Sequence, residues 1–266
     1  MHVLLTGATG TVGRFLLPAL TAAGHRVTTL GRSGDIPWTL GQPTPLPQGD
    51  ALIHAALAHT PGAYRGGEGD DPARFRALNL DGTLRLFDAA RDARILFLSS
   101  RAVYGDHRRA ELLHETDPAT PSSLYGEIKL VAEQALGPRG VSLRPTGIYG
   151  GDKWTPLFAA YLRGDPIAPR IATEVHGDDL AAAVLLLLDR PETGAFNVSD
   201  LLLDRHDLLA RVQALTACPH PPPPVASGPP PGRMATCRLR RLGWRPGGWP
   251  KLDAWLAATL CSETRA

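Results

Sequence analysis

Short apolar runs alternate with longer amphipathic stretches through the first half of the chain. Runs rich in valine, leucine and isoleucine predict buried strands, and stretches in which apolar residues recur every three or four positions predict helices. Strands that alternate with helices form a parallel sheet with helices on both faces, and the right-handedness of such crossovers favours a doubly wound α/β topology. We expect strands at residues 2–6, 26–30, 51–55, 94–99 and 141–144, and helices at residues 12–23, 73–91 and 123–136.

Two proline-rich stretches interrupt this alternation. Residues 31–49 contain four prolines, so we expect the helix that would join the second strand to the next one to be shortened or lost. Residues 219–232 contain eight prolines and predict an extended, polyproline-like connector. Beyond this connector, residues 252–260 predict a short closing helix.

Composition excludes several other classes of protein. The 266 residues are 43% hydrophobic and 20% charged, which is an ordinary globular balance. A net charge of +2 gives no indication of a nucleic-acid or membrane surface, and the longest apolar run, residues 180–188, is too short to span a bilayer. The three cysteines are far apart and form no metal-binding or disulfide pattern, and the first strand begins at once, without a targeting segment. We therefore expect a cytoplasmic protein with no metal, nucleic acid or membrane partner.

A glycine-rich sequence, Thr6-Gly-Ala-Thr-Gly-Thr-Val-Gly13, lies between the first expected strand and the first expected helix. Glycines at these positions allow a tight strand-to-helix turn, close approach of a pyrophosphate and close packing of the helix on the sheet. Free N–H groups at the start of the helix then favour a diphosphate, whereas the alternative is a plain glycine-rich turn. The residues expected to bind a dinucleotide here are Gly7, Thr9, Gly10, Thr11 and Val12.

The end of the second strand indicates which dinucleotide is favoured. A carboxylate there would bind the adenosine ribose of NAD, whereas an arginine suits the 2′-phosphate of NADP. The sequence is Leu30-Gly-Arg-Ser33, and the next carboxylate is Asp35. We therefore expect Arg32 to favour NADP over NAD. If Arg32 is only a solvated loop charge, NAD remains an alternative.

Three residues form a candidate proton-transfer group. Ser100 follows the strand at residues 94–99, at the sheet edge where ligands of open α/β sheets bind. Tyr125 and Lys129 are four residues apart on an expected helix, so their side chains share a face. The lysine ammonium would stabilise the tyrosine phenolate and lower its pKa, normally ~10, which suits general acid–base catalysis. Such a tyrosine–lysine spacing also arises by chance, and only its position in this pattern makes it informative.

These motifs, in their order and spacing, resemble the extended short-chain dehydrogenase/reductase family, in its group of NAD(P)-dependent epimerases, dehydratases and reductases. The resemblance implies that Tyr125 is a general acid/base, that Lys129 tunes its pKa and binds the cofactor ribose, and that Ser100 polarises the substrate carbonyl. It further implies that Ala55 and Ala56 line the cofactor and that Pro145 lies near the nicotinamide. An asparagine such as Asn79 would support the site through backbone bonds, or would simply pack. The resemblance rests on residues 7–13, 50–56, 79–83, 99–105, 125–129, 143–145, 175–181 and 196–199.

The sequence departs from the family pattern at two places that matter for ligands. Residues 36–48 contain no acidic residue, although family members have an adenine-contacting carboxylate in this segment. Ala172 stands where the family commonly has an arginine that binds a nucleotide-sugar diphosphate, and Arg170 comes two residues too early. Family members that act on nucleotide sugars are also usually longer. These departures weigh against a large nucleotide-linked substrate.

We expect a Rossmann-type dinucleotide-binding domain over residues 1–150, completed by segments near 170–200. Residues 151–266 then mainly form a small substrate-binding part. The leading hypothesis is an NADP-preferring oxidoreductase that transfers hydride at a carbonyl or alcohol carbon of a small or sugar-like molecule, in a chain that can form a homodimer. One alternative is a sugar epimerase or dehydratase that retains its cofactor. Another is a non-catalytic protein that senses NADP.

Overall fold

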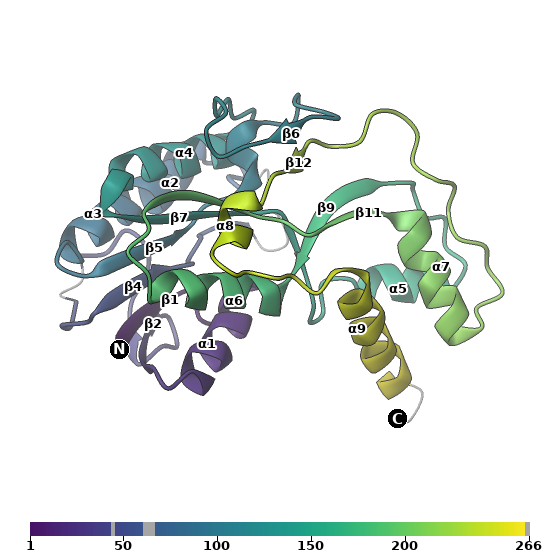
Figure 1. Ribbon diagram of the computed structural model, residues 1–266, viewed down its shortest axis with the longest axis horizontal. Coiled ribbons are helices and arrows are strands. Elements are labelled where there is room, and N and C mark those ends of the chain that lie inside the picture. The colour runs from purple at the N-terminus through teal and green to yellow at the C-terminus, as the bar shows by residue number, and fades with distance from the viewer. Residues whose placement is uncertain (44–45, 61–66, 264–266) are drawn as a thin grey trace.

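A parallel sheet forms the centre of the computed structural model, which describes residues 1–43, 46–60 and 67–263 (Figure 1). Seven strands lie in the order β10-β7-β5-β4-β1-β2-β3, and all neighbours are parallel. The chain reverses its direction of winding between β1 and β4, which is where ligands of doubly wound sheets bind. The predicted Rossmann-type fold is therefore confirmed. The strands are β1 (His2–Thr6), β2 (Arg26–Gly31), β3 (Ile36–Pro37), β4 (Ala51–His54), β5 (Arg94–Leu98), β7 (Gly140–Pro145) and β10 (Gly194–Val198).

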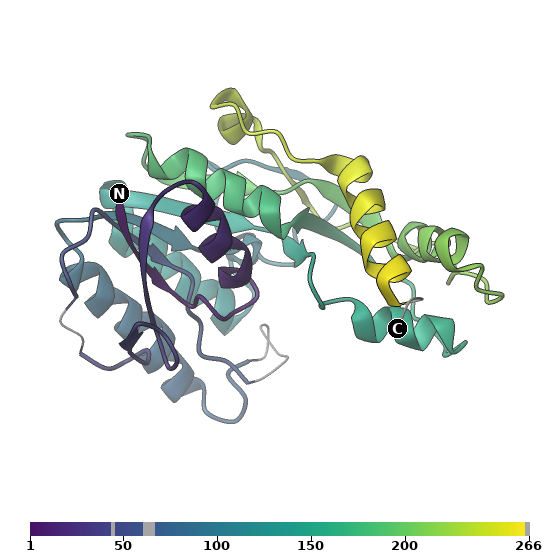
Figure 2. The same cartoon turned by 90° about the horizontal axis from the view of Figure 1, so that it is seen from below.

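Helices cover both faces of this sheet, as the two views in Figures 1 and 2 show. On one face, α1 (Gly13–Ala22) and α6 (Gly177–Leu188) bury leucines and valines against the strands. On the other face, α2 (Pro72–Arg76), α3 (Gly82–Ala89) and α4 (Leu124–Leu136) enclose a second apolar core. Burial of apolar side chains on both faces explains why the strands are continuous apolar runs rather than alternating ones.

The helix expected over residues 73–91 has an unexpected irregularity. It begins after Asp71, whose side chain accepts a hydrogen bond from the backbone N–H of Arg74, and it widens into a π-helical turn at Ala77–Asp81 before α3 continues it. Such turns insert one extra residue and often lie at functional sites. The turn thus changes which side chains face the sheet.

Neither proline-rich stretch forms a helix among its described residues, and the shortened connection expected after β2 is observed. Between β2 and β4, the described residues form no helix and only the short strand β3; Thr44 and Pro45 lie outside the described residues. Residues 219–232 form no helix, and only Pro231 makes an isolated strand bridge, with Arg109. The closing helix α9 (Gly248–Glu263) is longer than the predicted one at both ends. Among the described residues, no helix is long and apolar enough to cross a membrane.

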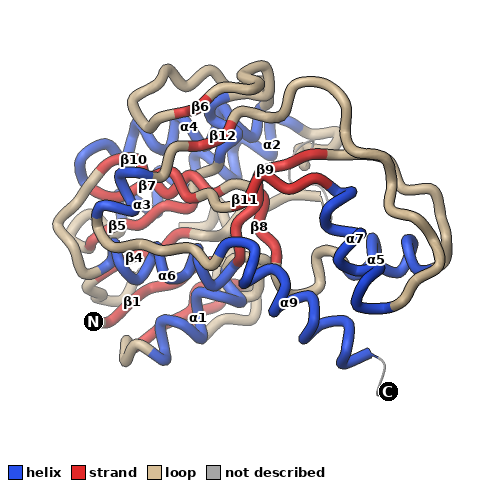
Figure 3. The backbone as a smooth tube through the Cα atoms, turned by 45° about the vertical axis from the view of Figure 1, so that its right-hand side comes forward, coloured by secondary structure: helices blue, strands red, loops and turns tan. Residues whose placement is uncertain are grey.

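A second, smaller sheet lies beyond the carboxyl edge of the first one (Figure 3). A single residue, Thr146, separates β7 from β8 (Gly147–Tyr149), so the chain passes directly from the large sheet to the small one. In the small sheet, β9 (Ile171–His176) pairs parallel with β8 and antiparallel with β11 (Leu201–Asp204). An aromatic core, which includes Tyr149 and Trp154 with ring centroids 5.2 Å apart, joins it to its helices. The remaining elements are α5 (Thr155–Leu162), α7 (Arg205–Thr216), α8 (Cys237–Arg241), β6 (Leu112–Leu113) and β12 (Arg233–Met234).

Candidate active site

The glycine loop forms a tight cradle between β1 and α1. Gly7 has a φ of +73°, and a Cβ there would lie 2.7 Å from the backbone of Ala55 and Ala56. A Cβ on Gly13 would lie 2.1 Å from the Gly7 carbonyl oxygen, so only glycine permits this approach of helix to loop. Thr9 and Gly10 are exposed, and Thr11 and Val12 are half-buried beside them. The loop therefore has the shape that a pyrophosphate needs.

A buried histidine, which the motif analysis did not single out, holds the end of β4 beside this loop. His54 lies between the Thr6 and Thr83 hydroxyls, with nitrogen-to-oxygen distances of 2.7 and 2.9 Å. Thr83 donates its own proton to the Asn79 carbonyl oxygen, so it must accept from His54 Nε2–H, and Thr6 then donates to Nδ1. Burial lowers the pKa of His54 to about 3, which keeps the ring neutral and suited to both bonds.

Thr6 and Asn79 extend this network to the segment expected to line the cofactor. The Thr6 hydroxyl accepts a hydrogen bond from the backbone N–H of Ala56. The Asn79 side chain, from the π-helical turn, accepts from the Ala58 N–H and donates to the Ala58 carbonyl oxygen, both at 2.7 Å. Of the two roles considered for Asn79, the structure therefore has the backbone-binding one. These bonds fix the path of the chain directly after β4.

Ser100 lies at the carboxyl end of β5, in a short turn that packs against the start of α4. Its hydroxyl caps a 3₁₀ turn at Arg101–Tyr104 by accepting from the Ala102 N–H at 3.1 Å. A Cβ on Gly126 would lie 2.6 Å from the Ala102 carbonyl oxygen. This glycine therefore lets the first turn of α4, which carries Tyr125, approach the Ser100 turn closely.

Tyr125 and Lys129 lie on the same side of α4, as their spacing predicts. The Lys129 ammonium is 5.9 Å from the centroid of the Tyr125 ring and donates a 2.7 Å hydrogen bond to the Leu98 carbonyl oxygen. Its side chain is buried, and burial lowers the pKa of Lys129 to about 7, with an opposing effect from Glu133. The structure thus places the lysine between the tyrosine and the end of the strand that leads to Ser100.

Glu133, one helical turn after Lys129, belongs to a buried polar network that sequence reasoning missed. It accepts hydrogen bonds from the Ser99 hydroxyl and from the Arg144 guanidinium, the latter at 2.6 Å. Arg144 also donates to the Tyr104 hydroxyl at 2.8 Å. Its neighbour Pro145 ends β7, buried, at the same edge of the sheet. The spacing of four residues from Lys129 was the one signal that would have indicated Glu133.

After β2, Arg32 is exposed, whereas the Asp35 carboxylate is hydrogen-bonded within the turn. Arg32 and Ser33 are both exposed. The Asp35 carboxylate accepts hydrogen bonds from the backbone N–H and hydroxyl of Thr29, at 2.8 and 2.9 Å. These bonds lower the pKa of Asp35, so its charge is held within the turn. Arg32 is therefore the charged group that this turn presents to a ligand.

A cavity of about 310 Å³ lies in the small sheet, on the face that carries Ala172. Arg170, directly before β9, also lines it, two residues from Ala172. Burial and the neighbouring Arg170 lower the pKa of Arg205. Lys153 pairs with Glu174 at 2.9 Å, beside the cavity wall. Although Arg170 comes two residues earlier in the sequence, it thus lines the same cavity as Ala172.

Together, the doubly wound sheet, the glycine cradle and the grouped Ser100, Tyr125 and Lys129 define a dinucleotide-binding α/β protein. The model of the NAD dependent epimerase/dehydratase family matches residues 3–156, more than half of the chain. The chain belongs to this family of NAD-dependent enzymes, as the resemblance implied.

Similar proteins include both reductases and epimerases. The dTDP-4-dehydrorhamnose reductase of Mycolicibacterium smegmatis is 29% identical over 71% of this chain, and the match spans only 60% of that reductase. The UDP-glucose 4-epimerase of Lacticaseibacillus casei is 27% identical over 92% of each chain. The structure of the UDP-glucose 4-epimerase of Thermus thermophilus, a complex with NAD, has a TM-score of 0.78 at 23% identity and covers 97% of this chain and 98% of its own. These relatives do not decide between the two activities.

Proposed function

We propose that the protein is an NADP-preferring oxidoreductase that transfers hydride at a carbonyl or alcohol carbon of a small molecule. The observation that carries this proposal is the position of the Lys129 ammonium, 5.9 Å from the Tyr125 ring and bonded to the Leu98 carbonyl oxygen two residues before Ser100. In this arrangement Tyr125 would donate the proton, Lys129 would lower the tyrosine's pKa, and Ser100 would donate a hydrogen bond to the substrate oxygen.

The residues at the site fit a nicotinamide dinucleotide. A Cβ on Gly7 or Gly13 would clash with protein backbone, so these glycines permit the tight turn and the close helix, and Gly10 between them would let a pyrophosphate approach the backbone. When bound, the nicotinamide would supply or accept the hydride. Ala55, Ala56 and Pro145 would line the cofactor, at the carboxyl ends of β4 and β7.

The chain's own part of the reaction is to hold and move a proton. Tyr125 would give its phenolic proton to the substrate oxygen during reduction and take it back during oxidation. The Ser100 hydroxyl would donate a hydrogen bond to the same oxygen. The Lys129 ammonium has further N–H groups beyond the one directed at Leu98, and these would bind the cofactor ribose and favour the ionised tyrosine.

The preference for NADP rests on the turn after β2. Arg32 is exposed there, and the bonds from Thr29 occupy the Asp35 carboxylate that would otherwise suit a ribose hydroxyl. A guanidinium binds a 2′-phosphate through paired, charge-assisted hydrogen bonds.

A sugar epimerase that retains its cofactor is the second candidate function. The similar epimerases favour it, and so do the arginines of the cavity in the small sheet. Arg170 and Arg205 line that cavity together, as the phosphate of a sugar-linked substrate would require.

One experiment separates these candidates. The purified protein is first tested for a dinucleotide that survives dialysis and is then mixed with NADPH and a panel of carbonyl compounds. A reductase will start without cofactor and consume NADPH, whereas an epimerase will retain its cofactor and consume none. Binding of NADPH without turnover in either assay would instead support a sensor. Size-exclusion chromatography with light scattering tests the homodimer, which stays a prediction.

A further inference from the structure

A second cavity, of about 230 Å³, lies on the opposite face of the small sheet. Strand alternation explains why there are two separate faces. Thr173 and Leu202 are paired in the ladder and line this second cavity, while their neighbours Ala172 and Leu203 line the cavity described above. We call the second one the Arg233 cavity. Its polar lining residues are Thr173, Ser199, Asp200, Arg233, Thr236 and Arg240.

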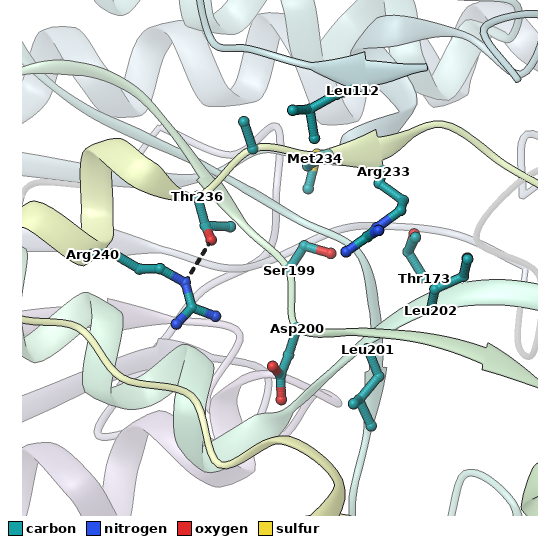
Figure 4. A pocket seen from close by; sticks show the side chains of 11 residues that line it. Leu112, Thr173, Ser199, Asp200, Leu201, Leu202, Arg233, Met234, Thr236 and Arg240 are labelled. Carbon is teal, nitrogen blue, oxygen red and sulfur yellow. Dashed lines mark hydrogen bonds between the residues drawn. The ribbon is translucent and has the colours of Figure 1, made fainter. Parts of the chain in front are cut away.

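Three donor groups converge in the Arg233 cavity from three separate elements. Arg233 comes from β12, Ser199 follows β10 and Thr173 lies in β9, and the Arg233 guanidinium points toward both hydroxyls (Figure 4). Thr173 and Ser199 are 6% and 7% exposed, so the hydroxyls belong to the floor of the cavity and not to the outer surface. Within the described part of the chain, none of the three side chains makes a hydrogen bond or ion pair.

The other end of the cavity has a different polarity. Arg240 donates to the Thr236 hydroxyl at 3.1 Å, and the Asp200 carboxylate accepts from the Gly248 N–H at 2.8 Å. The lining therefore contains two guanidinium groups and one carboxylate, an excess of positive charge. An anionic group fits the Arg233 end, and a hydroxyl that donates to Asp200 fits the other end.

We propose that the Arg233 cavity binds the phosphate group of a small hydroxylated molecule. A guanidinium and two hydroxyls can donate to several oxygens of one phosphate, and the floor hydroxyls are already in place. The cavity, of about 230 Å³, has room for a phosphate with a short polyol.

A hydrogen bond connects the segment that carries Arg233 to the turn that carries Ser100. Arg101, the residue after Ser100, donates from its guanidinium to the carbonyl oxygen of Gly232, the residue before Arg233, at 3.2 Å. The phosphate has two sources that this geometry admits. It is either part of the reacting substrate, which rests on the proposed function, or a separate ligand that acts on the Ser100 turn.

Titration with inorganic phosphate tests the site without any turnover. Calorimetry is done at constant ionic strength with NADP⁺ in excess, so that the glycine loop is filled. We expect saturable binding to the wild type and to Tyr125→Phe, and an affinity lowered about tenfold or more in Arg233→Gln. Arg241→Gln is the matched control, because Arg241 is exposed on α8 next to Arg240 and lies outside the cavity lining. It should bind phosphate as the wild type does.

Two results would overturn the proposal. One is an absence of saturable phosphate binding to the wild type. The other is binding that survives in Arg233→Gln and is lost in Arg170→Gln, which would assign the phosphate to the other cavity. The source of the phosphate is then read from kinetics on an active substrate. Phosphate that raises KM alone marks the subsite of a phosphorylated substrate, and phosphate that changes kcat marks a separate ligand.

Discussion

The carboxyl edge of the large sheet and the Arg233 cavity beside the small sheet differ in how their polar side chains are partnered. At the carboxyl edge of the large sheet, His54, Asn79 and Arg144 are buried or nearly so, and protein groups satisfy them. In the Arg233 cavity, the Thr173 and Ser199 hydroxyls and the Arg233 guanidinium have no hydrogen-bond or ion-pair partner among the described residues. The comparison indicates that the first region holds groups in fixed positions, and that the second leaves donors free for ligands.

This contrast has an energetic basis. A buried polar group that loses its hydrogen-bond partner lowers the free energy of unfolding by roughly 1–3 kcal/mol. The networks of the large sheet therefore hold each of their groups in one arrangement. Donors that face a solvent-filled cavity exchange one acceptor for another at little cost, because water satisfies them when no ligand is present. Substitutions in the two regions should therefore differ in kind. Substitutions at the edge of the large sheet should lower stability or turnover, and substitutions in the Arg233 cavity should change ligand affinity.

The largest effect is expected for Tyr125→Phe, which removes one hydroxyl from the large-sheet region. Turnover should fall about 100- to 10,000-fold, because the substrate oxygen loses its proton donor. The dissociation constant for NADPH, measured by fluorescence titration, should stay the same. Activity that persists in this variant would show that Tyr125 is not the proton donor. The large-sheet region would then have no demonstrated role in turnover that the Arg233 cavity lacks.

Lys129→Met should change how stability depends on pH. The pKa of Lys129 is about 7 in the folded chain and near 10.5 when unfolded, so between these values the unfolded chain binds more protons. The free energy of unfolding should therefore rise with pH across this window in the wild type. In the variant this rise should be smaller, as measured by urea unfolding at pH 7, 8, 9 and 10. Parallel curves for both proteins would mean that the lysine is not desolvated.

Asn79→Ala should weaken cofactor binding without touching the cofactor-binding residues themselves. It leaves the N–H and the carbonyl oxygen of Ala58 without their partner, at a cost of roughly 1–3 kcal/mol in stability or in NADPH affinity. Thermal unfolding with and without NADPH separates the two effects. Asp81→Ala, an exposed change in the same π-helical turn, should be neutral. Equal effects of both variants would show that the helix, and not the asparagine bond, matters.

The smallest expected effect is that of Arg32→Gln on cofactor choice. NADPH affinity should fall about tenfold, since a phosphate loses a charge-assisted pair, while NADH affinity should hardly change. Arg26→Gln, at the other end of β2 and also exposed, serves as the control. If both dinucleotides lose affinity equally in Arg32→Gln, the arginine contacts a part that they share.

The large sheet could be predicted because its signals are local in the sequence. The glycine loop and the Tyr125–Lys129 spacing each lie within a few consecutive residues, and β1, β4 and β5 are apolar runs of four or five residues. Two strands of the small sheet give no such signal. Its strand β8 has three residues, too few for a period to be visible, and β9 carries Thr173, Glu174 and His176 among its six residues, so it is not an apolar run. The separate pair of β6 and β12 has only two residues in each strand.

The missed parts of the site depend on partners that are distant in the sequence. The donor and the acceptor that hold His54 are Thr6, 48 positions before it, and Thr83, 29 positions after it. The π-helical turn, which carries Asn79, leaves no trace in the apolar pattern. The Arg233 cavity combines side chains from β9, β12 and the segment after β10, which only the folded chain brings together.

Because side chains alternate along β9, the linings of the two cavities can be changed independently by substitution. Ala172 and Glu174 line one cavity, and Thr173 between them lines the other. A library that varies one set can retune one ligand pocket while the second keeps its walls. A one-residue insertion in β9 would turn the side chains that follow it to the opposite face and so change the lining of both cavities. We therefore expect insertions in this strand to be far less tolerated than substitutions.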